Sequence, residues 1–202
     1  YPNCDPIIDA HGLVVAPGLI DVHVHFRDPG FTYKEDIHTG AMASAAGGFT
    51  TVVCMANTKP PVDNVETLEY VIREGKKTGI NVLTAGNITI GMKGETLTDM
   101  EELKADGGVG FSNGLYHGAR SDELGIGGSP AVAEDVLVAR DCMLALDTGA
   151  VIDIQHLSSG HSVRLIEVAQ DLGAHVVAEV TPHHFTLDES AVLKHGSLAK
   201  MN

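Results

Sequence analysis

His23 and His25 carry the clearest chemistry in this sequence, because two imidazoles two positions apart suit a metal ion. The apolar run Pro17–Val22 precedes them and predicts a strand over 19–25. Side chains two residues apart lie on the same face of a strand, so the two rings should lie side by side. Neutral imidazole is a good zinc ligand, and zinc can activate water near neutral pH. The pattern predicts half of a metal site, although two histidines at a strand end are also common as plain surface residues.

His156 repeats this arrangement later in the chain. It ends the apolar run 151–155 and precedes Ser158, Ser159 and Gly160, where a helix is expected to begin. Alone, such a histidine is more often a structural residue than a ligand. Beside the first pair it becomes a candidate third ligand, because residues at the carboxyl ends of barrel strands converge on one site.

Two further polar residues follow predicted strands. Arg27 lies two positions beyond His25, and its guanidinium would suit a substrate carboxylate. A salt bridge to Asp28 or Glu35 would explain Arg27 equally well. Asn57 follows the second predicted strand and offers a donor and an acceptor, although a turn residue is the simpler interpretation.

The remaining histidines are weaker candidates. His183 and His184 are adjacent and follow a predicted strand, where neighbouring side chains point in opposite directions. At most one of them can therefore face a shared site, and a structural role is favoured for this pair. His117 lies in a glycine-rich stretch and is expected to face solvent.

Valine- and isoleucine-rich runs alternate with segments of helical period. Strands are expected over 19–25, 49–55, 80–86, 109–112, 150–156 and 175–181, and helices over 36–46, 64–78, 97–106, 131–147 and 160–172. Thr98 and Glu101 predict a capping box, and Gly149 and Gly173 are expected to end helices. Strands that are apolar on both faces are typical of a buried parallel sheet. No glycine-rich nucleotide-binding motif follows any strand, so an α/β fold of the (β/α)8 barrel type is favoured over a doubly wound sheet.

The composition argues against several classes of partner. The chain has 27 acidic and 13 basic residues, a formal net charge of −14 and no basic cluster, which argues against nucleic acid and anionic membranes. Three widely spaced cysteines without a CxxC motif are typical of a reduced, cytoplasmic compartment. The sequence has no basic-then-apolar leader and no long apolar span, so neither secretion nor membrane insertion is expected.

The number of elements is smaller than a barrel requires. Six strands are predicted, whereas a closed barrel has eight and usually takes about 250 residues. The glycine-rich stretch 113–130 carries no strand or helix signal, and a single helix separates the strands at 109–112 and 150–156. We therefore expect a longer protein, of which an internal stretch and a carboxyl-terminal part are absent from this sequence.

The segment PGLIDVHVHFRDPG at 17–30 resembles the signature of type I dihydroorotases, which belong to the cyclic amidohydrolases. The resemblance continues in order through GGFTTV at 47–52, MANT at 55–58, GFS at 110–112, ARD at 139–141, HLS at 156–158 and AEVTPHH at 178–184. It implies a zinc-dependent (β/α)8 amidohydrolase barrel over 17–202, with strands five and eight absent. It also implies that 1–16 is the remnant of a small β domain.

The resemblance also implies a reaction and roles for residues. The reaction is the reversible interconversion of N-carbamoyl-L-aspartate and L-dihydroorotate in pyrimidine biosynthesis. By position, one or two zinc ions would be bound by His23, His25 and His156. The substrate contacts would be His25, Arg27, Asn57 and Asn202. The implied partners are the small-molecule substrate and either further copies of the chain or aspartate transcarbamoylase.

The chain departs from the family pattern in ways that leave alternatives open. Asn113 and Gly114 follow Ser112 where the family has a metal-bridging aspartate. The fifth-strand ligand block and the eighth-strand block with the catalytic aspartate are missing, so no catalytic aspartate is identified. One alternative is an inactive homologue that serves as a structural partner of aspartate transcarbamoylase. Absent segments are favoured over this, because losing whole strands would leave sheet edges unpaired. A dihydropyrimidinase or allantoinase is less favoured, because no lysine follows Ser112 to bridge two metals.

Overall fold

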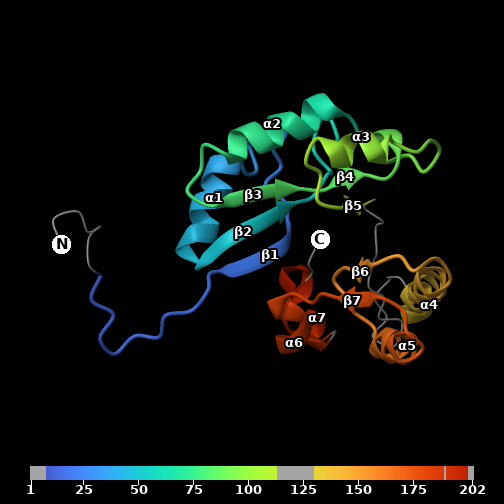
Figure 1. Cartoon of the computed structure of the whole chain (residues 1–202). Helices are drawn as coiled ribbons and strands as arrows, with labels where there is room; N and C mark the ends of the chain where they lie inside the picture. Colours follow the sequence, from blue (N-terminus) through green and yellow to red (C-terminus); the bar gives the residue numbers. More distant parts are fainter. Residues whose placement is uncertain (1–7, 113–129, 189, 200–202) are drawn as a thin grey trace. The chain divides into compact units, whose positions relative to one another are not determined.

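The computed structural model describes residues 8–112, 130–188 and 190–199 (Figure 1). The chain divides into two compact units, Tyr1–Gly114 and Leu115–Asn202. Each unit is an α/β structure in which parallel strands alternate with helices. The histidine pair lies in the first unit and His156 lies in the second.

The first unit is built on a three-stranded parallel sheet. The strands β1 (Leu19–Val24), β2 (Phe49–Cys54) and β3 (Asn81–Thr84) lie in the order β1-β2-β3. They are connected by α1 (Ile37–Ala46) and α2 (Val65–Gly75). Val24 pairs with Cys54, and Cys54 pairs with Thr84, so the carboxyl ends of the three strands are level.

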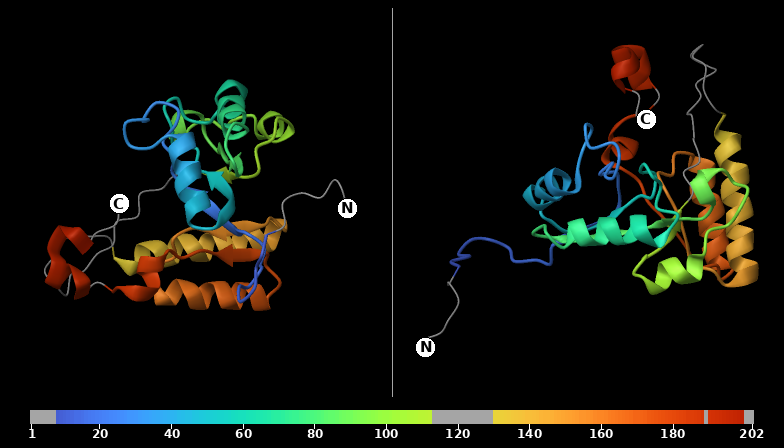
Figure 2. Two further views of the ribbon diagram at one scale, coloured as in Figure 1. Left: turned by 90° about the vertical axis from the view of Figure 1, so that its left-hand side faces the viewer. Right: turned by 90° about the horizontal axis from the view of Figure 1, so that it is seen from above.

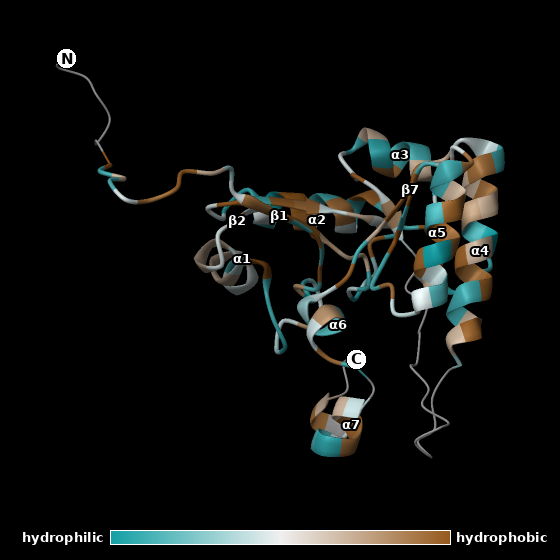
Figure 3. Ribbon diagram, turned by 90° about the horizontal axis from the view of Figure 1, so that it is seen from below, coloured by the Kyte–Doolittle hydropathy of each residue, from teal (hydrophilic) through white to brown (hydrophobic). Residues whose placement is uncertain are grey.

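One hydrophobic core joins this sheet to its helices. Its buried residues are Phe26, Ile37, Ala41, Val52, Cys54, Ala56, Val62, Leu68, Val71, Val82 and Leu103. Elsewhere β1 is incompletely covered within its unit, since Leu19 and Ile20 are 56% and 64% exposed. The hydrophobic colouring of β1 and β2 is visible in Figure 3. The carboxyl end of β1 is the well-packed part, because Phe26 is buried directly beyond it.

A smaller parallel pair completes the first unit. It consists of β4 (Gly86–Asn87) and β5 (Phe111–Ser112), with the short helices η1 (Ile90–Met92) and α3 (Met100–Ala105) between them. The predicted capping box at Thr98 is wrong. Asp99 caps α3 by accepting a hydrogen bond from the Glu102 N–H at 2.9 Å. The Thr98 hydroxyl instead donates to the carbonyl of Asn87 at 2.6 Å.

The second unit packs two helices on a two-stranded parallel sheet. The sheet pairs β6 (Ile152–Ile154) with β7 (Val176–Ala178). The helices α4 (Ala131–Thr148) and α5 (Gly160–Asp171) lie side by side (Figure 2). The buried core is Val138, Cys142, Ala145, Leu157, Ile166, Ala169, Ala174 and Val176. The short helices α6 (Pro182–Thr186), α7 (Ser190–His195) and η3 (Gly196–Ala199) follow β7.

The predicted elements are confirmed in type and order. Each of the six predicted strands contains an observed strand, and each predicted helix is found within three residues at either end. Gly149 ends α4 in the left-handed conformation (φ 72°), as predicted. The strands are shorter than predicted, and within residues 8–112, 130–188 and 190–199 they form sheets of three, two and two strands rather than a closed barrel. Strands of two or three residues offer too few ladder hydrogen bonds to build a continuous sheet.

Candidate active site

The two histidines at the end of β1 lie side by side, as their spacing predicts. The Nε2 atoms of His23 and His25 are 3.0 Å apart. The ring centroids are 4.9 Å apart, with an angle of 60° between the ring planes. The backbone around the pair is held to β2, because the Met55 N–H donates to the carbonyl of Val24 at 2.9 Å.

This separation suits two ligands of one metal ion. Zinc binds imidazole nitrogen at 2.0–2.1 Å, which places two nitrogens of a tetrahedral site about 3.3 Å apart. The observed 3.0 Å between the Nε2 atoms is close to that value. His23 and His25 could therefore bind one zinc ion through Nε2 with only a small adjustment of their side chains.

Asn57 determines which ring nitrogen of His25 carries the proton. Its Oδ1 lies 2.9 Å from Nδ1 of His25. An amide oxygen can only accept a hydrogen bond, so Nδ1 carries the proton and donates it. The neutral imidazole then keeps the lone pair of Nε2 for a metal, as is typical of metal-binding histidines. The sequence identifies Asn57 as a rim residue, but its contact with His25 depends on β1 and β2 being neighbours.

Arg27 is not paired with either of the acidic residues considered from the sequence. The Asp28 carboxylate accepts hydrogen bonds from the Tyr70 hydroxyl at 2.9 Å and from the Ile37 N–H at 3.4 Å. Glu35 accepts from the Asp36 N–H at 3.1 Å. Within the described part of the chain, Arg27 forms no ion pair.

Phe26 anchors the loop that carries these groups. Its side chain is 7% exposed and packs against α1, where a Cβ added at Gly40 would lie 2.5 Å from its Cδ1. Arg27, the next residue, has a left-handed backbone (φ 62°), and its carbonyl accepts from the Phe31 N–H at 2.9 Å. The buried ring and this turn together fix the backbone on both sides of the candidate substrate contact.

One buried and one partly buried group near this loop remain protonated at neutral pH. Burial, followed by hydrogen bonding to Asp28, raises the pKa of Tyr70 to about 12. Burial, followed by the negative charge of Asp28, raises the pKa of the Cys54 thiol to about 12. Neither side chain supplies an anionic nucleophile or a thiolate ligand, so the histidines are the better metal ligands here.

His156 stands at a strand end in the second unit, as predicted. It follows β6, and Ser159 caps the next helix, α5, by accepting from the His161 N–H at 3.2 Å. The backbone of His156 is left-handed (φ 41°), and its N–H donates to Glu179 Oε1 at 3.2 Å. Among the residues that the structure describes, no group of three or more His, Cys, Asp or Glu side chains is placed to hold a metal ion. The inclusion of His156 in a metal site therefore rests on the sequence.

His183 and His184 follow β7, as predicted, but they lie in the helix α6, so the expectation that their side chains point in opposite directions is wrong. The proline before them begins a helical turn, and the ring centroids lie 4.4 Å apart instead of on opposite faces. His184 Nε2 lies 3.1 Å from Ser158 Oγ, and His183 Nδ1 lies 2.6 Å from Thr181 Oγ1.

Four positions singled out in the sequence lie outside the described residues. They are the candidate substrate contact Asn202, the family departures Asn113 and Gly114, and His117. Their expected roles remain predictions. No helix in the described ranges is both long and apolar enough to cross a membrane.

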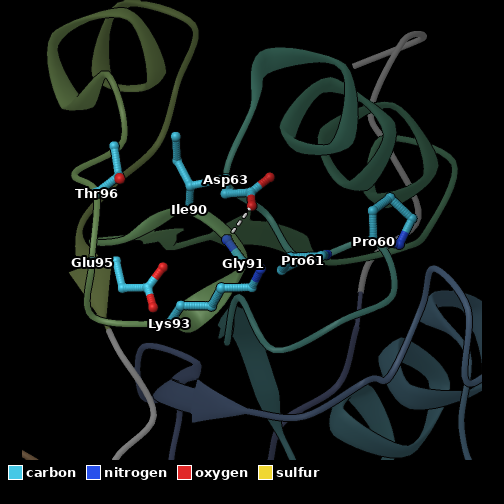
Figure 4. A pocket seen from close by; sticks show the side chains of 8 residues that line it. All are labelled: Pro60, Pro61, Asp63, Ile90, Gly91, Lys93, Glu95 and Thr96. Atoms are coloured by element: carbon cyan, nitrogen blue, oxygen red, sulfur yellow. Dashed lines mark hydrogen bonds between the residues drawn. The ribbon is translucent and has the colours of Figure 1, made fainter.

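A pocket of about 380 Å³ lies elsewhere in the first unit (Figure 4). It is lined by Pro60, Pro61, Asp63, Ile90, Gly91, Lys93, Glu95 and Thr96. Asp63 joins its two sides by accepting from the Gly91 N–H at 2.7 Å. The histidine pair does not line this pocket, and no motif in the sequence predicts it.

Solved structures with the same fold are hydantoinases. The L-hydantoinase (dihydropyrimidinase) from Arthrobacter aurescens superposes with a TM-score of 0.77 at 20% identity, covering 96% of this chain and 53% of that one. The D-hydantoinase (dihydropyrimidinase) from a Thermus species gives a TM-score of 0.66 at 22% identity, covering 91% and 50%. The chain therefore shares the α/β fold of these two structures.

Sequence relatives define the family more narrowly. The family described as dihydro-orotase-like matches residues 12–121. A dihydroorotase of Clostridioides difficile is 52% identical over 236 residues, covering 98% of this chain and 56% of the relative. A dihydroorotase of Streptococcus pneumoniae is 46% identical over 233 residues, covering 96% and 55%. The chain belongs to the dihydroorotase-like family, and it spans about half the length of these curated relatives.

Proposed function

We propose that this chain carries the metal-binding part of a dihydroorotase, which interconverts N-carbamoyl-L-aspartate and L-dihydroorotate in pyrimidine biosynthesis. The observation that carries the proposal is the histidine pair, whose Nε2 atoms are 3.0 Å apart and whose His25 is oriented by Asn57. The pair occurs in a chain that is 52% identical to a protein named dihydroorotase.

The residues present fit a zinc ion. His23 and His25 would each offer Nε2, and we propose His156 as a third ligand because of its position in the family motif. Zinc, when bound, would polarise the ring amide carbonyl and lower the pKa of water. Asn57 would support this chemistry by keeping the proton of His25 on Nδ1, away from the metal.

Arg27 would bind the substrate carboxylate through the fork of its guanidinium. Asn57 accepts from His25 through Oδ1, so its amide nitrogen can still donate to a substrate carbonyl. We retain Asn202 as a proposed contact, although it lies outside the described residues. Together these groups would orient the acidic ring with its reacting amide toward the histidine pair.

The proton-transferring aspartate is not identified in this chain. The alignment with the Clostridioides difficile relative spans 236 residues, more than the 202 residues of the chain, so that relative has internal residues without a counterpart here. This supports an absent internal stretch, which we place between 109–112 and 150–156, where a barrel would have its fifth strand. A second candidate function, an inactive homologue that supports aspartate transcarbamoylase as a structural partner, is less favoured because the loss of whole strands would leave sheet edges unpaired.

Metal content and turnover distinguish these candidates. The intact protein, including the segments that this chain lacks, is reconstituted with zinc, its bound zinc is measured, and interconversion of dihydroorotate and N-carbamoyl-L-aspartate is followed. Zinc with turnover supports the dihydroorotase, and zinc without turnover supports the inactive homologue. Turnover of hydantoin or dihydrouracil in place of dihydroorotate would indicate a dihydropyrimidinase. A protein that binds no zinc and has no turnover contradicts the proposal.

A substitution of Arg27 tests the substrate contact separately. In Arg27→Gln the Michaelis constant for the acidic substrate should rise while zinc stays bound. Loss of zinc from this variant would instead assign Arg27 a structural role. Lys34→Gln, which removes a nearby positive charge outside the proposed site, is the matched control.

We also propose a cytoplasmic location and binding partners for the whole protein. Cys54 and Cys142 are buried free thiols, which is compatible with a reduced cytoplasm. The proposed partners are the small-molecule substrate and either further copies of the chain or aspartate transcarbamoylase. Size-exclusion chromatography of the protein with and without the transcarbamoylase tests the last two.

A further inference from the structure

A chain of hydrogen bonds runs from α6 to the backbone of His156. The Thr181 N–H donates to Nδ1 of His184 at 3.2 Å. His184 Nε2 lies 3.1 Å from Ser158 Oγ, and the Ser158 hydroxyl donates to the carbonyl of His156 at 2.9 Å. All four residues belong to the second unit, and 26 positions of sequence separate Ser158 from His184.

The direction of each hydrogen bond follows from its donors. A backbone N–H can only donate, so Nδ1 of His184 is an acceptor and the neutral ring carries its proton on Nε2. Nε2–H then donates to Ser158 Oγ, and the serine proton is directed to the carbonyl of His156. This direction excludes a nucleophile and base pair, in which the imidazole would have to accept the serine proton. The pair is therefore arranged for positioning.

The His184 ring is held in this state by its surroundings. Burial, followed by the nearby charge of His183, lowers the pKa of His184, so the neutral form is favoured. Thr181 Oγ1 also lies 2.7 Å from Nδ1 of His184, on the same side as the amide donor. The Thr181 N–H is the contact that keeps Nδ1 an acceptor and Nε2 a donor toward Ser158, because the Thr181 hydroxyl can either donate or accept.

His156 needs such support because its backbone is strained. Its φ of 41° is in the left-handed region, which residues other than glycine rarely adopt. Glu179 Oε1 accepts from the His156 N–H at 3.2 Å, on one side of the residue. Beyond it, the Glu134 carboxylate accepts from the N–H groups of Ser158 and Ser159 at 2.8–3.2 Å. The His156 carbonyl lies between these two anchors and is held through Ser158.

We propose that His184 is a positioning residue, which fixes the backbone of His156 through Ser158 and so sets the direction of the His156 imidazole. The consequence for metal binding rests on the proposed function, in which His156 is a zinc ligand. The hydrogen-bond chain itself can be tested without zinc, so the two can fail separately.

The first test is NMR spectroscopy of the zinc-free 202-residue protein. The imidazole ¹⁵N shifts of His184 should show a protonated Nε2 and an unprotonated Nδ1. In His184→Phe and Ser158→Ala the backbone ¹³C and ¹⁵N shifts of His156 and Leu157 should move, whereas in the control His183→Phe they should not. A proton on Nδ1, or unchanged His156 shifts in both variants, would overturn the proposal whatever the zinc affinity.

The second test measures zinc affinity by competition with a chelator. Loss of an outer partner of a metal ligand typically weakens binding about 10- to 100-fold. His184 acts one step further away, through Ser158 and the carbonyl of His156, so His184→Phe should show a loss at the lower end of this range, about tenfold. His184→Gln, which keeps a donor and an acceptor, should recover part of it, and His183→Phe should stay within about twofold of the parent. If His156→Ala weakens zinc binding but His184→Phe binds zinc as tightly as the parent protein, the positioning role of His184 is overturned. If His156→Ala binds as tightly as the parent, the proposed ligand is wrong and the NMR result decides on His184.

Discussion

Replacing Asn57 with alanine should weaken the binding of zinc by the histidine pair. Oδ1 of Asn57 is the partner of Nδ1 of His25 at 2.9 Å, and this contact keeps the proton off Nε2. Without it, the imidazole can rotate and can carry its proton on the nitrogen that the metal needs. Zinc binding must then select one ring orientation and one tautomer from several.

The size of the effect follows from the contact. A neutral hydrogen bond contributes about 0.5–1.5 kcal/mol, and removal of an outer partner of a metal ligand costs about 10- to 100-fold in affinity. His25 is exposed and Asn57 is half-buried, so water can replace the lost acceptor in part. We therefore expect the lower end of the range, a loss of about tenfold, which corresponds to about 1.4 kcal/mol.

The assay is a titration of the zinc-free protein against a chromophoric chelator at pH 7.5. Asn57→Asp is the matched variant, because it keeps an acceptor beside Nδ1 and adds a negative charge, and its affinity should equal or exceed that of the parent. His25→Ala gives the loss expected when a ligand is removed. The reasoning is refuted if Asn57→Ala binds zinc as tightly as the parent while His25→Ala does not.

Three further predictions concern the loop that carries the site. Tyr70→Phe should lower the free energy of unfolding, measured in urea, by about 1.5–3 kcal/mol, because the buried Asp28 carboxylate loses a hydrogen-bond donor. In an absorbance titration the same variant should lack the tyrosine that ionises near pH 12. An unchanged midpoint and titration would show that this contact is not formed. Gly40→Ala should destabilise the protein, since overpacking against Phe26 costs about 1–3 kcal/mol and the gain in helix propensity is only about 1 kcal/mol; a higher melting temperature in calorimetry would contradict this. Hydrogen bonds from the first turn of α1, chiefly from the Thr39 N–H, lower the pKa of Asp36. The ionised carboxylate therefore stabilises the folded protein above the ordinary pKa of about 4, and this stabilisation is lost as the pH falls through the lower pKa of the folded state. Asp36→Asn should reduce this pH dependence between pH 2 and 5, and identical profiles would refute it.

The sequence predicts the histidine pair well because the determinants are local. Strand alternation alone places His23 and His25 on one side, and the observed separation of 3.0 Å agrees. Gly149 likewise ends its helix as predicted, since a left-handed residue at a helix end depends on its immediate neighbours.

Other contacts depend on residues that are distant in sequence. Thr98 has the spacing of a helix cap, but the carbonyl of Asn87 takes its hydroxyl and Asp99 becomes the cap. His184 matches a strand-end pattern, but Pro182 begins a helix and Ser158 becomes its partner. The partner of Thr98 is eleven positions away and that of His184 is 26 positions away, so neither contact can be read from the local pattern, although Pro182 after Thr181 is itself a local signal for a helix start.

The extent of the sheets also depends on tertiary contacts. The runs at 150–156 and 175–181 are apolar enough for long strands, yet only Ile152–Ile154 and Val176–Ala178 pair. A strand extends as far as its neighbour offers backbone partners, and among the described residues β6 and β7 pair only with each other. Barrel closure is therefore a prediction from the family for the longer protein.

X-ray absorption spectroscopy of the zinc-loaded 202-residue protein shows directly whether His23 and His25 bind zinc. Imidazole nitrogens should scatter at about 2.0–2.1 Å, and their number should fall by one in His23→Ala and by one in His25→Ala. His11→Ala, another histidine of the first unit, should leave the spectrum unchanged. A protein that binds no zinc, or a spectrum and affinity that survive the double variant His23→Ala/His25→Ala, would contradict the account.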